Sequence, residues 1–215
     1  MTSDPAGELH VSIALDEDAT LHLRPIHPDD AASLAEGFEH LSPESRYMRF
    51  FSPLERLSAT QLDYFTHIDY DRHFALVAYF EDPDGGDDIG VGVARYIRLD
   101  DPSKAEAAVV VLDEFHRRGI GRVLLEALLT VAHRSGVATM LLVVHADNTA
   151  MTAMMAALGA TPSPGDDATT VDFTIDLGEF VAARADSALR QEMDRALADP
   201  SAQADGRDGA TRPSA

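Results

Sequence analysis

Cysteine is absent from the 215 residues, and basic residues are few. Without cysteine, the chain can form no disulfide framework, thiolate metal site or Cys nucleophile. Seventeen Lys and Arg stand against 37 Asp and Glu, a net charge of −20. This charge argues against sequence-independent binding to nucleic acid or to an anionic membrane.

Long apolar runs are also missing. No run approaches the ~18 residues that a membrane helix needs. The N-terminus carries Asp4 and Glu8 where a targeting segment would have a basic start followed by an apolar stretch. The sequence therefore predicts a soluble cytoplasmic protein that binds neither nucleic acid nor membrane.

Histidine is the one common metal ligand besides the acids, and the chain has nine. None of them forms a His-Glu-x-x-His motif or a comparable ligand pair. We therefore expect no metal site.

One folded domain is the expectation for this length and its 45% hydrophobic content. We place it at residues 20–177, after an N-terminal extension over 1–19. Apolar residues recur every three or four positions in 179–198, so we expect an amphipathic C-terminal helix over 178–198 that packs on the body or on a second subunit of a homodimer. The small, polar stretch 199–215 lacks apolar surface, which predicts a disordered tail.

Strand and helix patterns alternate within the domain. Alternating or continuous apolar runs predict strands over 20–26, 73–80, 89–97, 105–112, 139–146 and 169–176. Caps and helical periodicity predict helices over 27–41, 42–51, 58–67, 119–135 and 148–158. The acidic segment 81–88 contains Pro and Gly-Gly, which indicates a turn. The fold class is α/β (α+β), with a mixed sheet and no internal repeat.

The most informative segment joins a buried strand to a helix through Arg117, Arg118, Gly119, Ile120 and Gly121. The first N–H groups of a helix lack internal partners, and the helix dipole is positive there. Glycine at two positions lets the backbone approach an anion closely. With Arg122 as a third arginine, this turn predicts a phosphate-binding site in an otherwise acidic protein.

The following helix is amphipathic. Apolar residues recur on one face at 123, 124, 127, 128, 131 and 132, and the opposite face carries Arg122, Glu126, Thr130 and Arg134. The apolar face is expected to pack on the sheet.

These features resemble the GNAT superfamily of acyl-CoA N-acyltransferases, whose phosphate-binding turn reads Gln/Arg-x-x-Gly-x-Gly/Ala. Here the turn begins with His116, followed by Gly119 and Gly121 at the family spacing. Asn148, Met151 and Gly159 match the family's later helix. The resemblance implies a mostly antiparallel central sheet flanked by helices, with acyl-CoA bound at a splayed strand pair.

The same resemblance implies which residues hold acetyl-CoA as co-substrate. They are Val109, Val110 and Val111 on the splayed strand, residues 116–122 of the turn, and Asn148 and Met151. The backbone of the splayed strand is implied to polarise the thioester carbonyl.

A narrower resemblance covers LRPIHPDD, LSPESRYMRFF, HIDYDRHFALVA and AEAAVVV. It is to the acetyltransferase domain of bacterial Pat-type protein lysine acetyltransferases, which modify acyl-CoA synthetases. It implies Glu106 as the catalytic glutamate. The alternative is that Glu106 only pairs with Lys104 at an exposed strand start.

The chemistry of lysine acetylation supports a general base. A lysine amine with a pKa near ~10.4 is neutral in only about one molecule in a thousand at pH 7, a deficit of roughly 4 kcal/mol. Glu106 would remove that proton directly or through water. Many GNAT enzymes carry a tyrosine seven residues after the helix Asn, but that position is Met155 here. With no cysteine to carry the acyl group, direct attack in a ternary complex is the consistent route; a Ser nucleophile is the alternative, but the chain has no Gly-x-Ser-x-Gly elbow.

Candidate acceptor-binding residues come from two segments. Arg46 and Tyr47 lie in the helical segment that borders the acceptor site in the superfamily. His67, Asp69 and Asp71 alternate in HIDYDRH and could line an amine-binding cleft, or they could form a polar turn that enters a strand.

Three functions compete. The first is an acetyl-CoA-dependent protein lysine acetyltransferase whose partner is an acceptor protein such as an AMP-forming acyl-CoA synthetase. The second is a small-molecule amine acetyltransferase, because the fold does not dictate the acceptor. The third is a non-catalytic acyl-CoA sensor.

Overall fold

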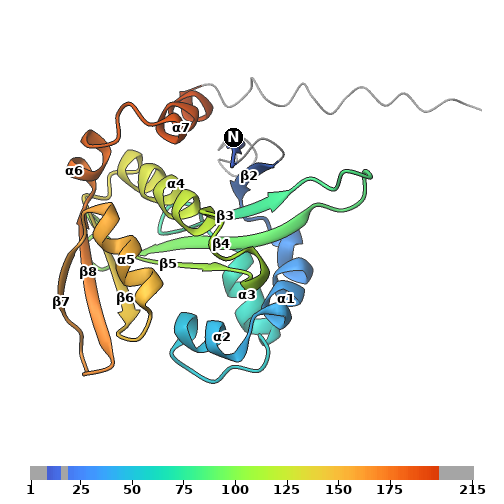
Figure 1. Cartoon of the computed structure of the whole chain (residues 1–215), viewed down its shortest axis with the longest axis horizontal. Coiled ribbons are helices and arrows are strands. Elements are labelled where there is room, and N and C mark those ends of the chain that lie inside the picture. Colours follow the sequence, from blue (N-terminus) through green and yellow to red (C-terminus); the bar gives the residue numbers. More distant parts are fainter. Residues whose placement is uncertain (1–8, 16–18, 199–215) are drawn as a thin grey trace, which may run out of the picture.

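The computed structural model describes residues 9–15 and 19–198. Its strands are β1 Val11–Ala14, β2 Thr20–Pro25, β3 His73–Phe80, β4 Ile89–Arg98, β5 Lys104–Val111, β6 Thr139–His145, β7 Thr161–Pro164 and β8 Thr170–Asp176. They form one sheet in the order β1-β2-β3-β4-β5-β6-β8-β7 (Figure 1). Only β5 and β6 pair in parallel. The predicted mixed, mostly antiparallel sheet is confirmed.

Helices cover both faces of this sheet. They are α1 Ala31–His40, α2 Pro43–Phe50, α3 Ala59–Thr66, α4 Ile120–Arg134, α5 Thr149–Leu158, α6 Leu177–Ala182 and α7 Ala188–Ala198, with short 3-10 turns η1 Pro28–Asp30 and η2 Asp113–Phe115. In Figure 1, α4 lies above the central strands and α1, α2 and α3 lie below them. The apolar face of α4 is buried on β3, β4 and β5, as its periodicity predicts.

Two strands were not predicted from the sequence. β1 lies in the stretch assigned to the N-terminal extension, and it pairs with β2. Its four residues are too few for a period-two pattern to stand out. β7 contains Pro162 and Pro164, which break most strands but are tolerated here because β7 is an edge strand.

The C-terminal helix differs from its prediction. The apolar periodicity of 179–198 predicts one helix, but the structure has two, α6 and α7. Ser187 separates them, because its side-chain oxygen accepts a hydrogen bond from the Arg190 amide at 3.2 Å and so caps a new helix. Phe180 of α6 and Met193 of α7 are both buried in the core. The predicted disordered tail, 199–215, lies outside the described residues.

The polar face of α4 is also covered. Glu126 and Thr130 are only 8% and 4% exposed. Both α6 and α7 pack on α4, and Arg184 approaches Glu126 Oε1 at 3.4 Å. The C-terminal helices therefore pack on the body of their own chain. No helix within the described ranges is both long and apolar enough to cross a bilayer.

Candidate active site

The parallel strands β5 and β6 separate along their length. They pair only from Lys104 with Thr139 to Glu106 with Leu141. β5 nevertheless continues to Val111 beside β4, and β6 continues to His145 beside β8. A V-shaped opening therefore begins directly after Glu106, and it is the splayed pair that the resemblance to the GNAT superfamily implies.

Alternation along β5 decides which backbone groups face this opening. The Leu112 amide donates to Val91 O and the Leu99 amide to Lys104 O, both at 2.9 Å. Even-numbered residues of β5 thus direct their N–H and C=O groups to β4, and odd-numbered residues direct theirs to the opening. The carbonyl of Val111 is engaged there by His116 Nε2 at 2.9 Å. Val109 therefore directs both its backbone groups to the opening, and Val111 directs its N–H there.

The predicted phosphate-binding turn lies at the start of α4. Gly119 is its N-cap, with φ of +81°, a left-handed conformation that glycine adopts without strain. Both Arg122 and Val123 donate their amides to Gly119 O at 3.1 Å. The amides of Gly119, Ile120 and Gly121 precede these first bonds, so they have no acceptor within the helix. Together they form a cradle suited to an anion.

The three arginines of the turn differ in their contacts. The guanidinium of Arg118 lies over the rings of Phe80 and Phe115, at 5.1 and 5.8 Å from their centroids. Arg122 instead points along α4 and bonds Glu126 Oε1 at 2.8 Å. Glu126 therefore offsets the charge of Arg122, and Arg117 and Arg118 remain as the cations of the turn.

The asparagine before α5, Asn148, has a structural role as the N-cap of that helix. Asn148 Oδ1 accepts a hydrogen bond from the Met151 amide at 3.0 Å and caps α5. Met151 packs against the core, and Met155 is fully buried. The cofactor-binding roles of Asn148 and Met151 stay predictions.

Glu106 lies exposed at the point where β5 and β6 separate. Lys104 does not pair with it, because the Lys104 ammonium lies 3.9 Å from Asp101. Among the described residues, no hydrogen bond or ion pair engages the Glu106 carboxylate. The charge that it influences is Arg49 on α2: burial lowers the pKa of Arg49 to about 10, and the nearby Glu106 carboxylate opposes that shift.

α2 also contacts the other side of the opening. Tyr47, 42% exposed, packs its ring edge-on against His145 at the end of β6, with centroids 5.6 Å apart. Tyr47 therefore borders the opening, and its acceptor-binding role stays a prediction. His145 was not singled out from the sequence, because nothing local distinguishes it from the other histidines.

The remaining predicted acceptor residues make contacts within the fold. Arg46 donates to the carbonyls of Glu39 and Glu55, each at 2.8 Å. His67 pairs with Asp63 at 3.0 Å, and the Asp71 carboxylate lies 3.5 Å from Arg98.

The side chain of Asp69 holds the backbone of its own turn in place. Its Oδ1 accepts hydrogen bonds from the amides of Asp71, Arg72 and His73 at 3.0, 2.8 and 2.9 Å. These bonds favour the turn interpretation of HIDYDRH over the amine-binding cleft. The substrate-binding roles of Arg46, His67, Asp69 and Asp71 stay predictions.

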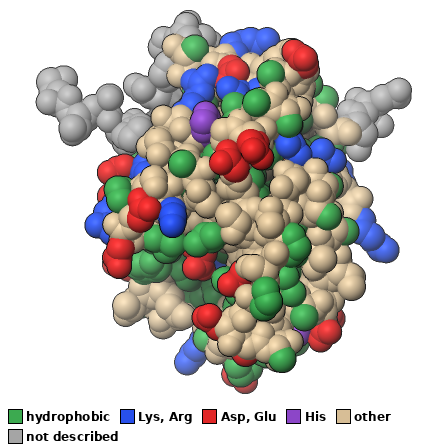
Figure 2. All heavy atoms as spheres, turned by 90° about the vertical axis from the view of Figure 1, so that its left-hand side faces the viewer, with side chains coloured by type: hydrophobic (Ala, Val, Ile, Leu, Met, Phe, Trp, Pro, Cys, Tyr) green, Lys and Arg blue, Asp and Glu red, His purple; other side chains and the backbone are tan. Residues whose placement is uncertain are grey.

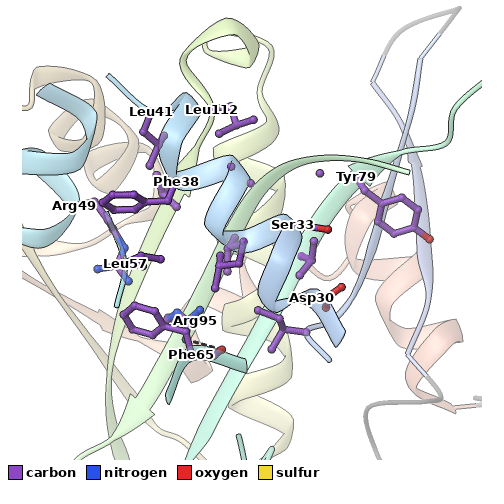
Figure 3. Close-up of a pocket in the computed structure, with 18 of the residues that line it drawn as sticks. Asp30, Ser33, Phe38, Leu41, Arg49, Leu57, Phe65, Tyr79, Arg95 and Leu112 are labelled. Atoms are coloured by element: carbon purple, nitrogen blue, oxygen red, sulfur yellow. Dashed lines mark hydrogen bonds between the residues drawn. The ribbon is translucent and has the colours of Figure 1, made fainter. Parts of the chain in front are cut away.

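A pocket of about 120 Å³ lies between α1, α2, α3 and the sheet (Figure 3). Aliphatic and aromatic residues form most of its wall, and the charged residues that line it are Arg24, Asp30, Arg49, Asp88 and Arg95. Figure 2 shows a different view, the face at the left of Figure 1, where hydrophobic side chains gather around a hollow with acidic groups at its edge. Within residues 9–15 and 19–198, no three His, Asp or Glu side chains are grouped to hold a metal ion.

A separating parallel strand pair beside an amide cradle is the arrangement that defines an acyl-CoA-dependent acyltransferase. The chain belongs to the GNAT acetyltransferase family, because a family model described as an acetyltransferase (GNAT) domain matches residues 20–161.

Individual relatives agree with this assignment. The chain is 32% identical to acetyltransferase PA5475 of Pseudomonas aeruginosa over 68% of this chain and 77% of that protein. It is 34% identical to acetyltransferase Pat of Mycolicibacterium smegmatis over 65% of its own length, but it spans only 40% of that longer protein. The crystal structure of the GNAT domain of S. lividans PAT superposes with a TM-score of 0.70 at 30% identity, covering 78% of this chain and 96% of that one.

Proposed function

We propose that this chain transfers an acetyl group from acetyl-CoA to a lysine side chain of a protein, such as an AMP-forming acyl-CoA synthetase, with Glu106 as general base. The similarity to Pat of M. smegmatis and to the S. lividans PAT domain supports this acceptor class. The net charge of −20 also suits a cationic acceptor.

The residues present fit a CoA thioester. The free amides of Gly119, Ile120 and Gly121, with Arg117 and Arg118 beside them, suit the pyrophosphate. The backbone of Val109 faces the opening and suits the pantetheine arm and the thioester carbonyl. Acetyl-CoA would supply an electrophilic acyl carbon there.

The position of Glu106 supports its proposed role as general base. Its carboxylate is exposed, unpaired among the described residues, and at the closed end of the opening. It is therefore available to hold the incoming lysine and to take its proton, directly or through water. The buried Met155 can offer no proton to the departing thiolate, so solvent or another side chain supplies it.

The decisive experiment is transfer of labelled acetyl from acetyl-CoA to a purified AMP-forming acyl-CoA synthetase, with mass spectrometry to locate the label. We expect label on a synthetase lysine, and a loss of about 10²-fold or more in rate with Glu106→Gln. Glu179→Gln is the matched control, because Glu179 is exposed on α6.

Two results would contradict the proposal. Near-normal turnover of the Glu106→Gln enzyme would remove Glu106 as base. Label that appears on polyamines or aminoglycosides but on no protein of a cell lysate would make the chain a small-molecule amine acetyltransferase.

A further inference from the structure

The pocket beneath α1 has charged residues in two groups, one with Arg24, Asp30 and Asp88 and one with Arg49 and Arg95. Figure 3 shows Arg49 and Arg95 at the same end of the pocket, beside Phe65 and Leu57, with Asp30 toward the other end. Asp30 is already neutralised there by Arg24, through bonds of 2.6 and 2.7 Å. The pocket therefore has a largely apolar middle, with two cations at one end and carboxylates beside Arg24 in its other charged group.

Neither of these guanidinium groups has a carboxylate partner within ion-pair distance in the described part of the chain. Arg49 stacks on Phe50, with its central carbon 4.8 Å from the ring centroid. Arg95 stacks on Phe65 at 4.5 Å, and its Nη1 contacts Phe65 O at 3.2 Å and His73 Nε2 at 2.9 Å. Aromatic stacking holds each group in place but leaves most of its N–H donors unused.

Both arginines are charged at neutral pH. Burial lowers the pKa of Arg95 to about 9, and the charge of Arg49 lowers it in the same direction. Burial lowers the pKa of Arg49 to about 10. Two cations held together in an apolar pocket repel an incoming ammonium and attract an anion. The acceptor lysine therefore belongs outside the pocket, near Glu106.

The pocket adjoins the reaction site along β5. Val110 and Leu112 line it with their side chains, whereas Val109 between Glu106 and these residues turns its backbone to the opening. Arg49 links the two regions, since it lines the pocket and lies close enough to Glu106 to interact with its charge. A group attached to the acyl carbon can thus extend from the opening toward the arginines.

We propose that this pocket binds the terminal carboxylate of a short dicarboxylic acyl group, such as succinyl, carried on CoA, with Arg49 as its principal ligand. The inference rests on the proposed transfer to lysine. The acceptor lysine is a cation, so it cannot be the ligand of the two arginines, and the anion that they bind must be part of the acyl group. The site prefers such an acyl group over a neutral one of the same length.

The reaction is an ordinary acyl transfer. The lysine nitrogen forms a C–N bond with the acyl carbon while the C–S bond breaks and its electron pair leaves with sulfur. The amine proton passes to Glu106 or water, and the product amide keeps its free carboxylate. No oxidant, reductant or further reactant is required.

Binding of two stable thioether analogues of succinyl-CoA tests the pocket without any acceptor. One analogue ends in a carboxylate and the other in the isosteric carboxamide, and their dissociation constants are compared by titration calorimetry. We expect the carboxylate to bind wild-type protein about tenfold more tightly, a difference worth about 1.4 kcal/mol. The net charge of −20 acts in the opposite direction, so the overall field of the protein cannot produce this preference.

Variants then test whether Arg49 is responsible for the preference for the carboxylate analogue. Arg49→Gln should abolish the preference, Arg49→Lys should keep part of it, and Arg56→Gln should leave it unchanged, because Arg56 is exposed. Equal or tighter binding of the carboxamide to wild-type protein would overturn the proposal, and this comparison needs no variant to fold. A preference that persists in Arg49→Gln would overturn the role of Arg49. Failure to label a lysine would contradict the proposed function alone, because these titrations contain no acceptor.

Discussion

The carboxylate of Asp113 accepts two hydrogen bonds from Ser42, one from its backbone amide at 3.0 Å and one from its hydroxyl at 2.8 Å. Ser42 is the N-cap of α2, and Asp113 begins η2, just before the predicted phosphate-binding turn. The two residues therefore join the helix that carries Tyr47 and Arg49 to the segment that would hold the cofactor.

This junction predicts a pH-dependent contribution to stability. Partial burial would raise the pKa of Asp113, but hydrogen bonds from Ser42 and Ser45 outweigh it, and the pKa lies below its usual value. The stabilisation is therefore present at neutral pH and is lost as the pH falls through the lowered pKa. We expect Asp113→Ala to reduce the free energy of unfolding by about 1–2 kcal/mol at pH 7. Urea denaturation at pH 7 and in acid, where the difference should shrink, checks this, and an undiminished difference in acid would contradict it.

Close packing of β4 on β5 predicts a contrast between two glycines. A Cβ at Gly92 would lie 2.8 Å from Val110 O and 3.0 Å from Leu124 Cδ1, whereas a Cβ at Gly90 would meet nothing within 4 Å. Gly92→Ala should therefore cost about 1–3 kcal/mol of stability. Gly90→Ala is the matched control and should change stability by less than about 0.5 kcal/mol. Equal unfolding midpoints for the two variants would contradict this prediction, because they would show that β5 can shift away from the added Cβ with no loss of stability.

Buried His73 predicts a loss of stability in mild acid. Burial and the adjacent Arg95 lower its pKa to about 4, against the attraction of Asp69. The unfolded imidazole has a pKa near ~6.5, so between about pH 6.5 and 4 the unfolded chain binds a proton that the native protein does not. Stability thus falls through this window as the pH falls, by about 2–3 kcal/mol.

Variants test the assignment of this loss to His73. His73→Gln should abolish most of the change between pH 7 and 4.5, measured by urea denaturation. His40→Gln is the control, since His40 is exposed, and it should behave as wild type. The assignment fails if His73→Gln loses as much stability as the wild type does.

The burial of α6 predicts that the C-terminal helices contribute to the core. Phe180 is 4% exposed, and the Arg184 guanidinium lies 4.4 Å from its ring centroid. Phe180→Ala should cost about 3–4 kcal/mol in free energy of unfolding. The neighbouring exposed Glu179→Ala should cost less than about 0.5 kcal/mol. If the two variants unfolded alike in urea, α6 would be peripheral.

Local signals in the sequence predicted the phosphate-binding turn, most helices and the central strands. Gly119 needs its left-handed conformation, Ser42 and Ser58 cap their helices, and Val123 to Ala132 repeat with helical spacing. Each of these effects acts over only a few residues, so the order of residues along the chain is enough to reveal them. The resemblance to the GNAT family rests on the same short motifs.

Partners that are far apart in sequence could be found only in the folded chain. Residues 126 and 184 are 58 positions apart, yet Arg184 Nε lies 3.4 Å from Glu126 Oε1. The ends of β5 and β6 diverge because β4 and β8 hold them on opposite sides. Arg49 and Arg95 share one pocket through the packing of α2 on the sheet.

The sequence by itself therefore determined the family, most helices and the central strands, and it predicted the anion-binding turn, because those depend on neighbouring residues. Tertiary structure alone decided that Glu106 has no hydrogen-bond or ion-pair partner among the described residues, that it influences Arg49, and that two arginines lie at one end of a largely apolar pocket. Burial and charge depend on what packs around each side chain.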